Sequence, residues 1–326
     1  MRAMTLEAAG RPLVLRHHED PVPGPGEVRI HVEACGVCRT DLHLIDGELP
    51  GLAPPVVPGH EVVGWVECVG AGVEALVPGQ RVGVPWLGAT CGTCDYCRGG
   101  RENLCDAPEF TGYTRPGGFA SHLVARADFC IPLGEVDPVA CAPLLCAGLI
   151  GWRALDRTNE AGTIGIYGFG AAAHLMTQIA RHQGRRVLAF TRPGDQAAQD
   201  FARAHGVAWA GDSNAATPEL LDAAIIFAPS GELVPQALRA VRKGGRVVCG
   251  GIHMSDIPSM PYQWLWGERE LVSVANLARS DARAFFDQAR RACVRATTRR
   301  YRLERANEAL DDLRHGRFQG SAVLVP

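Results

Sequence analysis

Hydrophobic positions in the first 140 residues form short runs that end at glycine and proline. Segments 27–37, 61–70 and 80–86 are either continuously apolar or alternate between apolar and polar residues, which is the pattern of β-strands. Pro-Gly turns separate these runs. This part of the chain is therefore predicted to form a compact, mostly β domain.

The pattern changes close to Cys146. Segment 163–190 reads as a strand, a glycine turn, a helix and a second strand. Four more strands are expected at 207–210, 221–230, 245–251 and 270–275, with helices at 195–205 and 233–244. Strands and helices that alternate at this spacing predict a parallel, doubly wound sheet, and six strands match a complete dinucleotide-binding Rossmann fold. The fold class expected is α/β, a β-rich domain joined to a six-stranded Rossmann domain.

The C-terminal tail is too short to be a domain of its own. Two helices, 281–295 and 304–315, and a final strand, 321–326, are expected there. We expect this tail to return to the first domain. The domain boundaries predicted are 1–147, 148–276 and 277–326.

Composition narrows the classes of partner. The 326 residues are 47% hydrophobic and 21% charged, with a formal net charge of −2 and no long basic run, so neither nucleic acid nor a membrane surface is expected as a partner. The N-terminus lacks the apolar core of a signal peptide, and the longest apolar stretch, 139–152, is short for a membrane span and contains Pro143. A cytoplasmic protein is expected.

Four of the twelve cysteines lie within fifteen positions, at Cys91, Cys94, Cys97 and Cys105. In a reducing compartment such thiols favour metal binding or catalysis over disulfides. A redox pair would need a thioredoxin-like setting, which is missing, and four buried small side chains would be the blandest interpretation. Two CxxC steps that share a cysteine, closed by a fourth thiol, fit the tetrahedron of a structural zinc ion.

The sequence GFGAAA directly follows a predicted strand and opens a predicted helix. Gly168 allows the tight turn, Gly170 lets the backbone approach a pyrophosphate, and Ala173 keeps the helix close to the strand. The first helical residues, Ala171 and Ala172, turn their N–H groups towards the phosphates. A plain tight turn is the alternative, but the strand–turn–helix context favours a dinucleotide site.

The end of the next strand bears on the choice of cofactor. Thr191 and Arg192 stand where NAD-binding proteins usually carry an acid, and the first carboxylate, Asp195, comes later. A guanidinium can bind a 2′-phosphate with two hydrogen bonds, whereas a carboxylate would repel it. NADP(H) is therefore expected in preference to NAD(H), the alternative being that Arg192 is simply a solvated surface side chain.

A second metal site is suggested by three separated residues. Cys38, His60 and Cys146 are a thiolate, an imidazole and a thiolate, one of the ligand sets of catalytic zinc. Each of them alone could be an ordinary buried side chain. Their separation along the chain leaves open whether they meet.

The motifs GVCRTDLH, PGHE, the four-cysteine segment, LLCAG and GFGAAA occur in the order found in one family. Over essentially the whole chain, the sequence resembles zinc-dependent alcohol dehydrogenases of the medium-chain dehydrogenase/reductase (MDR) family. The resemblance implies a GroES-like first domain and a zinc ion beside the Rossmann domain, held by Cys38, His60 and Cys146. Two zinc ions per chain are thus expected.

The same resemblance implies further roles. Glu61 matches a carboxylate that lies behind the zinc or exchanges onto it, and Asp41 matches the carboxylate that orients the zinc-bound histidine. Thr40 and His43 match the proton relay, and Arg39 a contact to the cofactor pyrophosphate. The chain departs from the family at Ile150, where a threonine is frequent, and near the C-terminus, where Gly320 and Ser321 replace a frequent arginine.

The function expected is that of an alcohol dehydrogenase or aldehyde reductase that transfers a hydride between a small-molecule alcohol or aldehyde and NADP(H). Alternatives are an NAD-dependent polyol or secondary-alcohol dehydrogenase, which often has Glu where this chain has Cys146, and a non-catalytic nucleotide-binding zinc protein. Zinc-free enone reductases of the same superfamily lack these cysteines. Kinship also implies a homodimer or homotetramer paired near 270–276, and a substrate pocket walled by Trp86, Ile150 and the region of Trp264 and Trp266.

Overall fold

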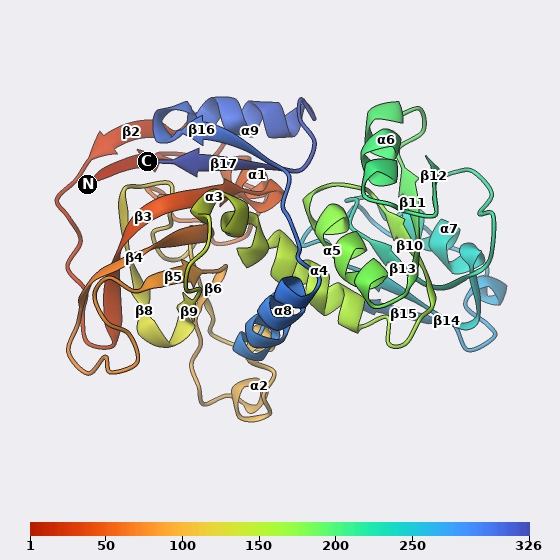
Figure 1. The fold of residues 1–326 in the computed structure, drawn as a ribbon, viewed down its shortest axis with the longest axis horizontal. Helices are drawn as coiled ribbons and strands as arrows, with labels where there is room; N and C mark the ends of the chain where they lie inside the picture. Colours follow the sequence, from red (N-terminus) through yellow and green to blue (C-terminus); the bar gives the residue numbers. More distant parts are fainter. The chain divides into compact units, whose positions relative to one another are not determined.

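The computed structural model describes all residues, 1–326, and divides into two compact units (Figure 1). The first unit comprises 1–147, 276–282 and 296–326, and the second comprises 148–275 and 283–295. The segment 277–326 is thus shared between them: its last strands belong to the first unit, while most of helix α8 belongs to the second.

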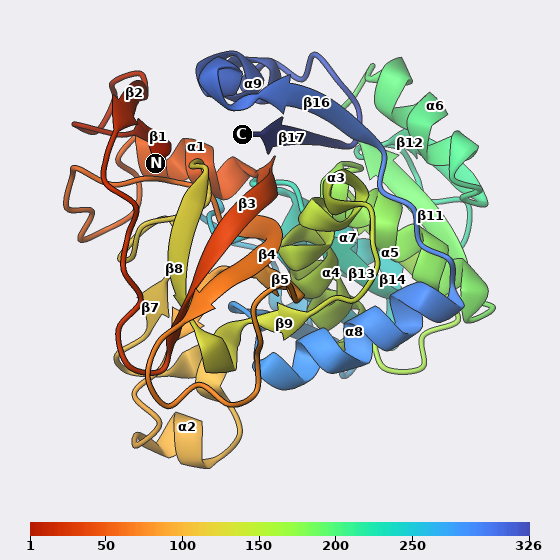
Figure 2. The same cartoon turned by 60° about the vertical axis from the view of Figure 1, so that its left-hand side comes forward.

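The first unit is built on a seven-stranded sheet. Its strand order is β16-β17-β3-β4-β5-β9, with β8 pairing β3 in addition. The predicted strands are present as β3 (Glu27–Val37), β4 (Glu61–Val69) and β5 (Arg81–Val84). The C-terminal strand β17 (Ser321–Val325) lies antiparallel to β3, so strands from distant parts of the sequence lie side by side in one sheet, as Figures 1 and 2 show.

The remaining elements of this unit are short. They are β1 (Arg2–Thr5), β2 (Val14–His17), α1 (Arg39–Ile45), β6 (Leu87–Ala89), α2 (Asp95–Arg98), η1 (Glu102–Leu104), β7 (Glu109–Phe110), β8 (His122–Arg126), η2 (Ala127–Phe129), β9 (Ile131–Pro132), α3 (Pro138–Cys141), η3 (Ala142–Leu145), β16 (Thr298–Arg302), η5 (Leu303–Arg305) and α9 (Ala306–Arg314). Helix α2 lies in a loop that projects from the sheet in both views (Figures 1 and 2).

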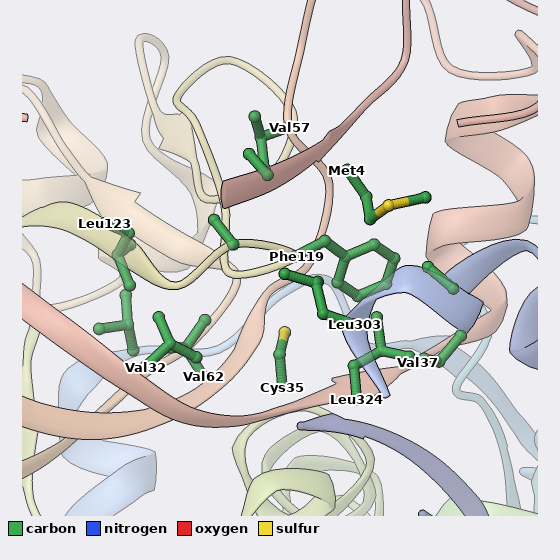
Figure 3. Packing of buried hydrophobic residues seen from close by; sticks show 14 of the residues in the cluster. Met4, Val32, Cys35, Val37, Val57, Val62, Phe119, Leu123, Leu303 and Leu324 are labelled. Carbon is green, nitrogen blue, oxygen red and sulfur yellow. The ribbon is translucent and has the colours of Figure 1, made fainter. Parts of the chain in front are cut away.

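Alternation along β3 explains how this sheet packs. Val28, Ile30 and Val32 are buried, while the residues between them face outwards, so one face of the strand joins the core. In Figure 3 the fully buried Phe119 lies among apolar side chains that include Leu303 and Leu324 from the C-terminal part of the chain. The core of the unit therefore depends on both ends of the sequence.

The second unit is the predicted Rossmann sheet. Its strand order is β12-β11-β10-β13-β14-β15 and every neighbouring pair is parallel. The strands are β10 (Thr163–Tyr167), β11 (Arg186–Thr191), β12 (Trp209–Asp212), β13 (Leu221–Ile226), β14 (Val241–Cys249) and β15 (Glu270–Ser273). This is the 3-2-1-4-5-6 order of dinucleotide-binding folds, in which ligands bind where the order reverses, here between β10 and β13.

Several boundaries differ from the sequence prediction: β13 ends at Ile226 instead of 230, and β14 begins at Val241 instead of 245. Strand β12 begins two residues later than expected, and the helix expected over 233–244 ends at Ala240 because Val241 already pairs with Leu221. The helices here are α4 (Ala147–Asp156), α5 (Ala171–His182), α6 (Gln196–Ala204), α7 (Leu233–Ala240), η4 (Tyr262–Trp264) and α8 (Arg279–Arg291), the last beginning in the first unit.

A membrane span would need a long apolar helix, and none of the helices taken singly meets that requirement. Only residues 138–145 and 147–156 taken together, as a pair bent by 47°, satisfy the length and composition tests.

Candidate active site and metal centres

The four clustered cysteines converge in the loop that carries α2. Their sulfur atoms all lie within 4.8 Å of one another, and none of them forms a disulfide. The sulfurs of Cys91 and Cys105 are 3.5 Å apart. Sulfurs bound about 2.3 Å from one tetrahedral zinc ion would be roughly 3.8 Å apart, so this spacing suits a shared ion.

Backbone N–H groups point at these sulfurs. The amide of Cys94 lies 3.4 Å from the sulfur of Cys91, and the amide of Ala107 lies 3.4 Å from that of Cys105. Hydrogen bonds from the amides of Thr93 and Cys94 lower the pKa of Cys91 to about 6. Such donors stabilise thiolates, the form that binds a metal ion.

The second set of predicted ligands also meets, although its members are far apart in sequence. The ligand atoms of Cys38, His60, Glu61 and Cys146 lie within 4.8 Å of one another, with the two sulfurs 3.8 Å apart. Cys38 precedes helix α1, His60 and Glu61 stand at the start of β4, and Cys146 follows η3. All four belong to the first unit.

Unpartnered polar atoms show that this cluster suits a cation. The Nε2 of His60 and the Oε2 of Glu61 are buried and have no hydrogen-bond partner. A buried imidazole nitrogen and a buried carboxylate oxygen left without partners are costly unless an ion completes them. The donor set of two sulfurs, one nitrogen and one oxygen fits zinc.

The charges in this cluster perturb one another. The hydrogen bond with Cys146, followed by the neighbouring His60, lowers the pKa of Cys38, and the same bond together with burial raises the pKa of Cys146. Burial and the nearby Cys38 raise the pKa of Glu61. A divalent cation would reverse the direction for Glu61 and Cys146, because it favours the anionic form of each group.

Asp41 holds the histidine from behind. Its Oδ1 lies 3.2 Å from the Nδ1 of His60, close enough for an ion pair although the angle is poor for a hydrogen bond, and both side chains are only 1% exposed. Burial alone would lower the pKa of His60, but the carboxylate of Asp41 and the sulfur of Cys38 raise it. Asp41 also accepts hydrogen bonds from the amides of Cys38 and Gly59, which fix its position.

The other predicted residues of this unit lie on α1. The hydroxyl of Thr40 is 3.7 Å from the sulfur of Cys38, and Thr40 is buried. His43 follows one turn later, and its Nδ1 contacts a carboxylate oxygen of Glu48 at 2.5 Å. Arg39 is exposed at the start of the helix.

An aromatic wall stands beside His60. The ring of Trp86 meets His60 edge to face at 4.9 Å and stacks on Phe110 and Tyr113 at centroid distances of 5.0 and 5.7 Å. Trp86 was expected from the sequence to line the substrate pocket, whereas Phe110 and Tyr113 were not. These two rings follow the cysteine loop closely, yet only the pairing of β6 with β7 brings them to Trp86.

The glycine turn is formed as predicted in the second unit. Gly168 has a left-handed φ of 88°, and a Cβ there would meet Ala228 at 2.9 Å, so only glycine fits. Around the Cα of Gly170 a Cβ would meet nothing within 4 Å, leaving room for a ligand before helix α5. Ala173 is fully buried, while Ala171 and Ala172 are partly exposed in the first turn.

The two residues at the end of β11 that were predicted to bind the cofactor differ in exposure. Thr191 is buried, and its hydroxyl lies 3.4 Å from the carbonyl oxygens of Arg192 and Gly211. Arg192 is exposed, and its guanidinium forms no ion pair. Asp195 accepts a hydrogen bond from the amide of Ala198 and so caps helix α6.

Comparison with known proteins agrees with this geometry. The model of the "Alcohol dehydrogenase GroES-like domain" matches residues 24–135. The chain is 46% identical over 315 residues to the "Probable alcohol dehydrogenase AdhA" of Mycobacterium tuberculosis, covering 94% of this chain and 90% of that protein. The "putative zinc-binding dehydrogenase" from Sinorhizobium meliloti bound to NADP has 28% identity and a TM-score of 0.85, covering 100% of this chain and 99% of that one.

A second similar structure was solved with NAD bound. The acetophenone reductase from Geotrichum candidum in complex with NAD has 26% identity and a TM-score of 0.90, covering 100% of this chain and 97% of that one. The resemblance read from the motifs is thereby confirmed, as is the two-part fold. The chain belongs to the zinc-dependent alcohol dehydrogenases of the medium-chain dehydrogenase/reductase family.

Proposed function

We propose that this alcohol dehydrogenase holds two zinc ions and interconverts hydrophobic alcohols and aldehydes with NADP(H). The observation that carries the proposal is the convergence of Cys38, His60 and Cys146 with the unpartnered Nε2 of His60. When bound there, zinc supplies Lewis acidity that lowers the pKa of an alcohol or polarises an aldehyde. The four-cysteine loop would hold a second, structural ion.

The side chains of α1 are proposed to move the proton. Thr40, whose oxygen is 3.7 Å from the sulfur of Cys38, would accept the proton of the substrate hydroxyl as it gives its own proton to the ribose of the cofactor. His43 would take it onwards, because imidazole exchanges protons readily near neutral pH. Arg39, exposed at the start of the helix, would contact the cofactor pyrophosphate. Asp41 would keep the ring of His60 oriented throughout.

The cofactor proposal rests on Arg192. Its guanidinium is exposed and unpaired, and Asp195, the first acid after the strand, is engaged in capping α6. A 2′-phosphate near β11 would therefore meet a cation rather than a carboxylate. Relatives of known structure bind either NAD or NADP, so the choice is tested on this chain's own arginine.

The experiment compares kcat/KM for NADPH and NADH with the purified zinc-loaded enzyme, and with its Arg192→Ala variant. We expect the wild type to prefer NADPH and the variant to lose about tenfold in kcat/KM for NADPH alone, since a charge-assisted contact contributes roughly 1.5–3 kcal/mol. Arg283→Ala, which removes an exposed arginine of α8, is the control. A wild type that favours NADH would refute the cofactor proposal.

The substrate class follows from the aromatic wall. Trp86, Phe110 and Tyr113 present stacked rings next to His60, which suit an apolar or aromatic group on the alcohol. Benzaldehyde and cinnamaldehyde should therefore be reduced with higher kcat/KM than acetaldehyde or glyceraldehyde. Activity confined to polyols would favour the alternative of a polyol dehydrogenase, and cofactor binding without turnover of any substrate would favour a non-catalytic protein.

Assembly is proposed through the free edge of the second sheet. Strand β15 is the last strand and its Leu271 and Val272 are half-buried, while Ile252 and Trp266 nearby in the sequence are 57% and 61% exposed. A second copy pairing along this edge would cover backbone groups that are otherwise unpaired. Sedimentation of the purified protein tests this homodimer, or a tetramer built from it, against a monomer.

A further inference from the structure

A carboxylate lies on the far side of the proposed relay histidine. The Nδ1 of His43 is 2.5 Å from the Oε2 of Glu48. His43 is largely enclosed, with a side chain 16% exposed, whereas that of Glu48 is 45% exposed. The pair therefore connects a largely buried imidazole with the solvent.

Local backbone geometry builds this contact. At the end of α1 the amide of Glu48 donates to the carbonyl of His43 at 2.9 Å, and the amide of Gly47 donates to that of Leu44 at 3.1 Å. Gly47 has a left-handed φ of 78°. These are the two hydrogen bonds of a Schellman motif, a helix ending that brings residues five apart together. Glu48 is thus placed beside His43 by the turn itself.

Neighbouring charges leave Glu48 available to His43. Asp46 is engaged by Arg314 of α9, with both oxygens 2.7 Å from the guanidinium. Arg314 also acts on Glu48 electrostatically, and Arg39 lies one helical turn before His43. The charged groups near the His43–Glu48 pair include Asp46, Arg39 and Arg314.

We propose that Glu48 is a positioning residue for His43. Its carboxylate accepts a hydrogen bond from the Nδ1–H group of His43 and so fixes the tautomer in which Nε2 can accept a proton from the relay. When the Nε2–H bond forms and the relay O–H bond breaks, the adjacent carboxylate balances the imidazolium charge. The Nδ1 proton then passes to Glu48 and on to water, which leaves a neutral ring protonated on Nε2. Exchange of the tautomer returns the remaining proton to Nδ1 and restores the starting state. This inference rests on the proposed role of His43.

The test measures single-turnover alcohol oxidation by the zinc-loaded enzyme between pH 6 and 9. Glu48→Gln should lower the rate about tenfold at the acidic end, as loss of a group that orients an active-site histidine commonly does, and less at alkaline pH, where hydroxide can take the proton. The KM for cofactor should change less than about twofold because Glu48 touches the relay only. Glu48→Asp should recover most of the rate, and Glu74→Gln, at an exposed site elsewhere in the same unit, should have no effect.

A double-variant cycle distinguishes the role of Glu48 from the proposed role of His43 in the proton relay. In a His43→Gln background, Glu48→Gln should cause no further loss, because Glu48 acts through that ring. If Glu48→Gln lowers the rate in the His43→Gln background as much as it does in the wild type, Glu48 does not act through His43. The same conclusion holds if His43→Gln is impaired but Glu48→Gln alone keeps the full rate. Either result would overturn the role of Glu48 and leave the proposed role of His43 intact. A fully active His43→Gln enzyme would instead remove the relay and this inference together.

Discussion

At the scale of single residues, the tightest constraint on the metal cluster is a glycine. Gly36 of β3 pairs with Glu61 of β4, and a Cβ at Gly36 would lie 1.7 Å from the Oε2 of Glu61. The missing side chain therefore makes the space in which that carboxylate lies. Gly36 opens the motif GVCRTDLH, but the sequence does not reveal this role, because the role exists only once the two strands pair.

Gly36→Ala should therefore displace Glu61 and disturb the metal cluster. We expect activity to fall at least about tenfold while the zinc of the four-cysteine loop is retained, since overpacking of a full core forces side chains away from their positions. Zinc per chain and kcat measure this. Adding Glu61→Ala removes the clashing carboxylate and leaves a contact of 2.9 Å with the Cβ of Glu61, so the double variant should regain part of the lost metal. An unimpaired Gly36→Ala enzyme would contradict the steric argument.

At the scale of elements, helix α5 carries a buried histidine. His174 is fully buried, its Nδ1 lies 3.2 Å from the carbonyl oxygen of Gly170 in the glycine turn, and its ring is 5.3 Å from that of His205. Burial lowers the pKa of His174 from 6.5 to about 4. The helix that begins at the nucleotide turn thus contains an imidazole that stays neutral at physiological pH.

The unfolded chain takes up a proton at this position more readily than the folded one. The stability that the neutral ring contributes is therefore complete above pH 6.5, declines as the pH falls, and is lost below about pH 4, for a total of roughly 3 kcal/mol. His174→Leu should flatten the fall in melting temperature between pH 7.5 and 5, although its stability at pH 7.5 will drop with the lost hydrogen bond. The control His182→Gln, at an exposed site on the same helix, should keep the wild-type slope. Equal slopes in all three proteins would rule out His174 as the source.

The strands were the part of the structure that sequence patterns predicted best. Alternation and apolar runs placed β3, β4 and the six Rossmann strands, because one face or both faces of each must be buried. The start of β12 and the end of α7 were shifted, since pairing between strands decides those boundaries. The two ligand sets were predictable from residue type and family motif. Phe110, Tyr113 and Glu48 were not, because strand pairing or a helix ending, rather than spacing, brings them to the site.

At the scale of the whole molecule, the two ligand sets should behave independently. Both lie in the first unit but share no residue. Zinc analysis should find about two equivalents in the wild type and about one in Cys38→Ala, which should fold but lack activity. Cys105→Ala should also bind about one equivalent and should melt at a lower temperature, because the loop loses its cross-link. A single equivalent in the wild type that survives in Cys38→Ala would leave the active site without its metal.

The position of β17 in the first sheet sets the order in which the two units can fold during translation. This strand lies between β16 and β3, so the first sheet stays incomplete until residues 321–325 have left the ribosome. Most of the second unit ends at residue 275 and can fold earlier, which at about 5–20 residues per second is a lead of several seconds. The part translated first is thus finished last. A stop codon just before residue 321 would spare the fold of the second unit and leave the sheet of the first unit with an open gap beside β3.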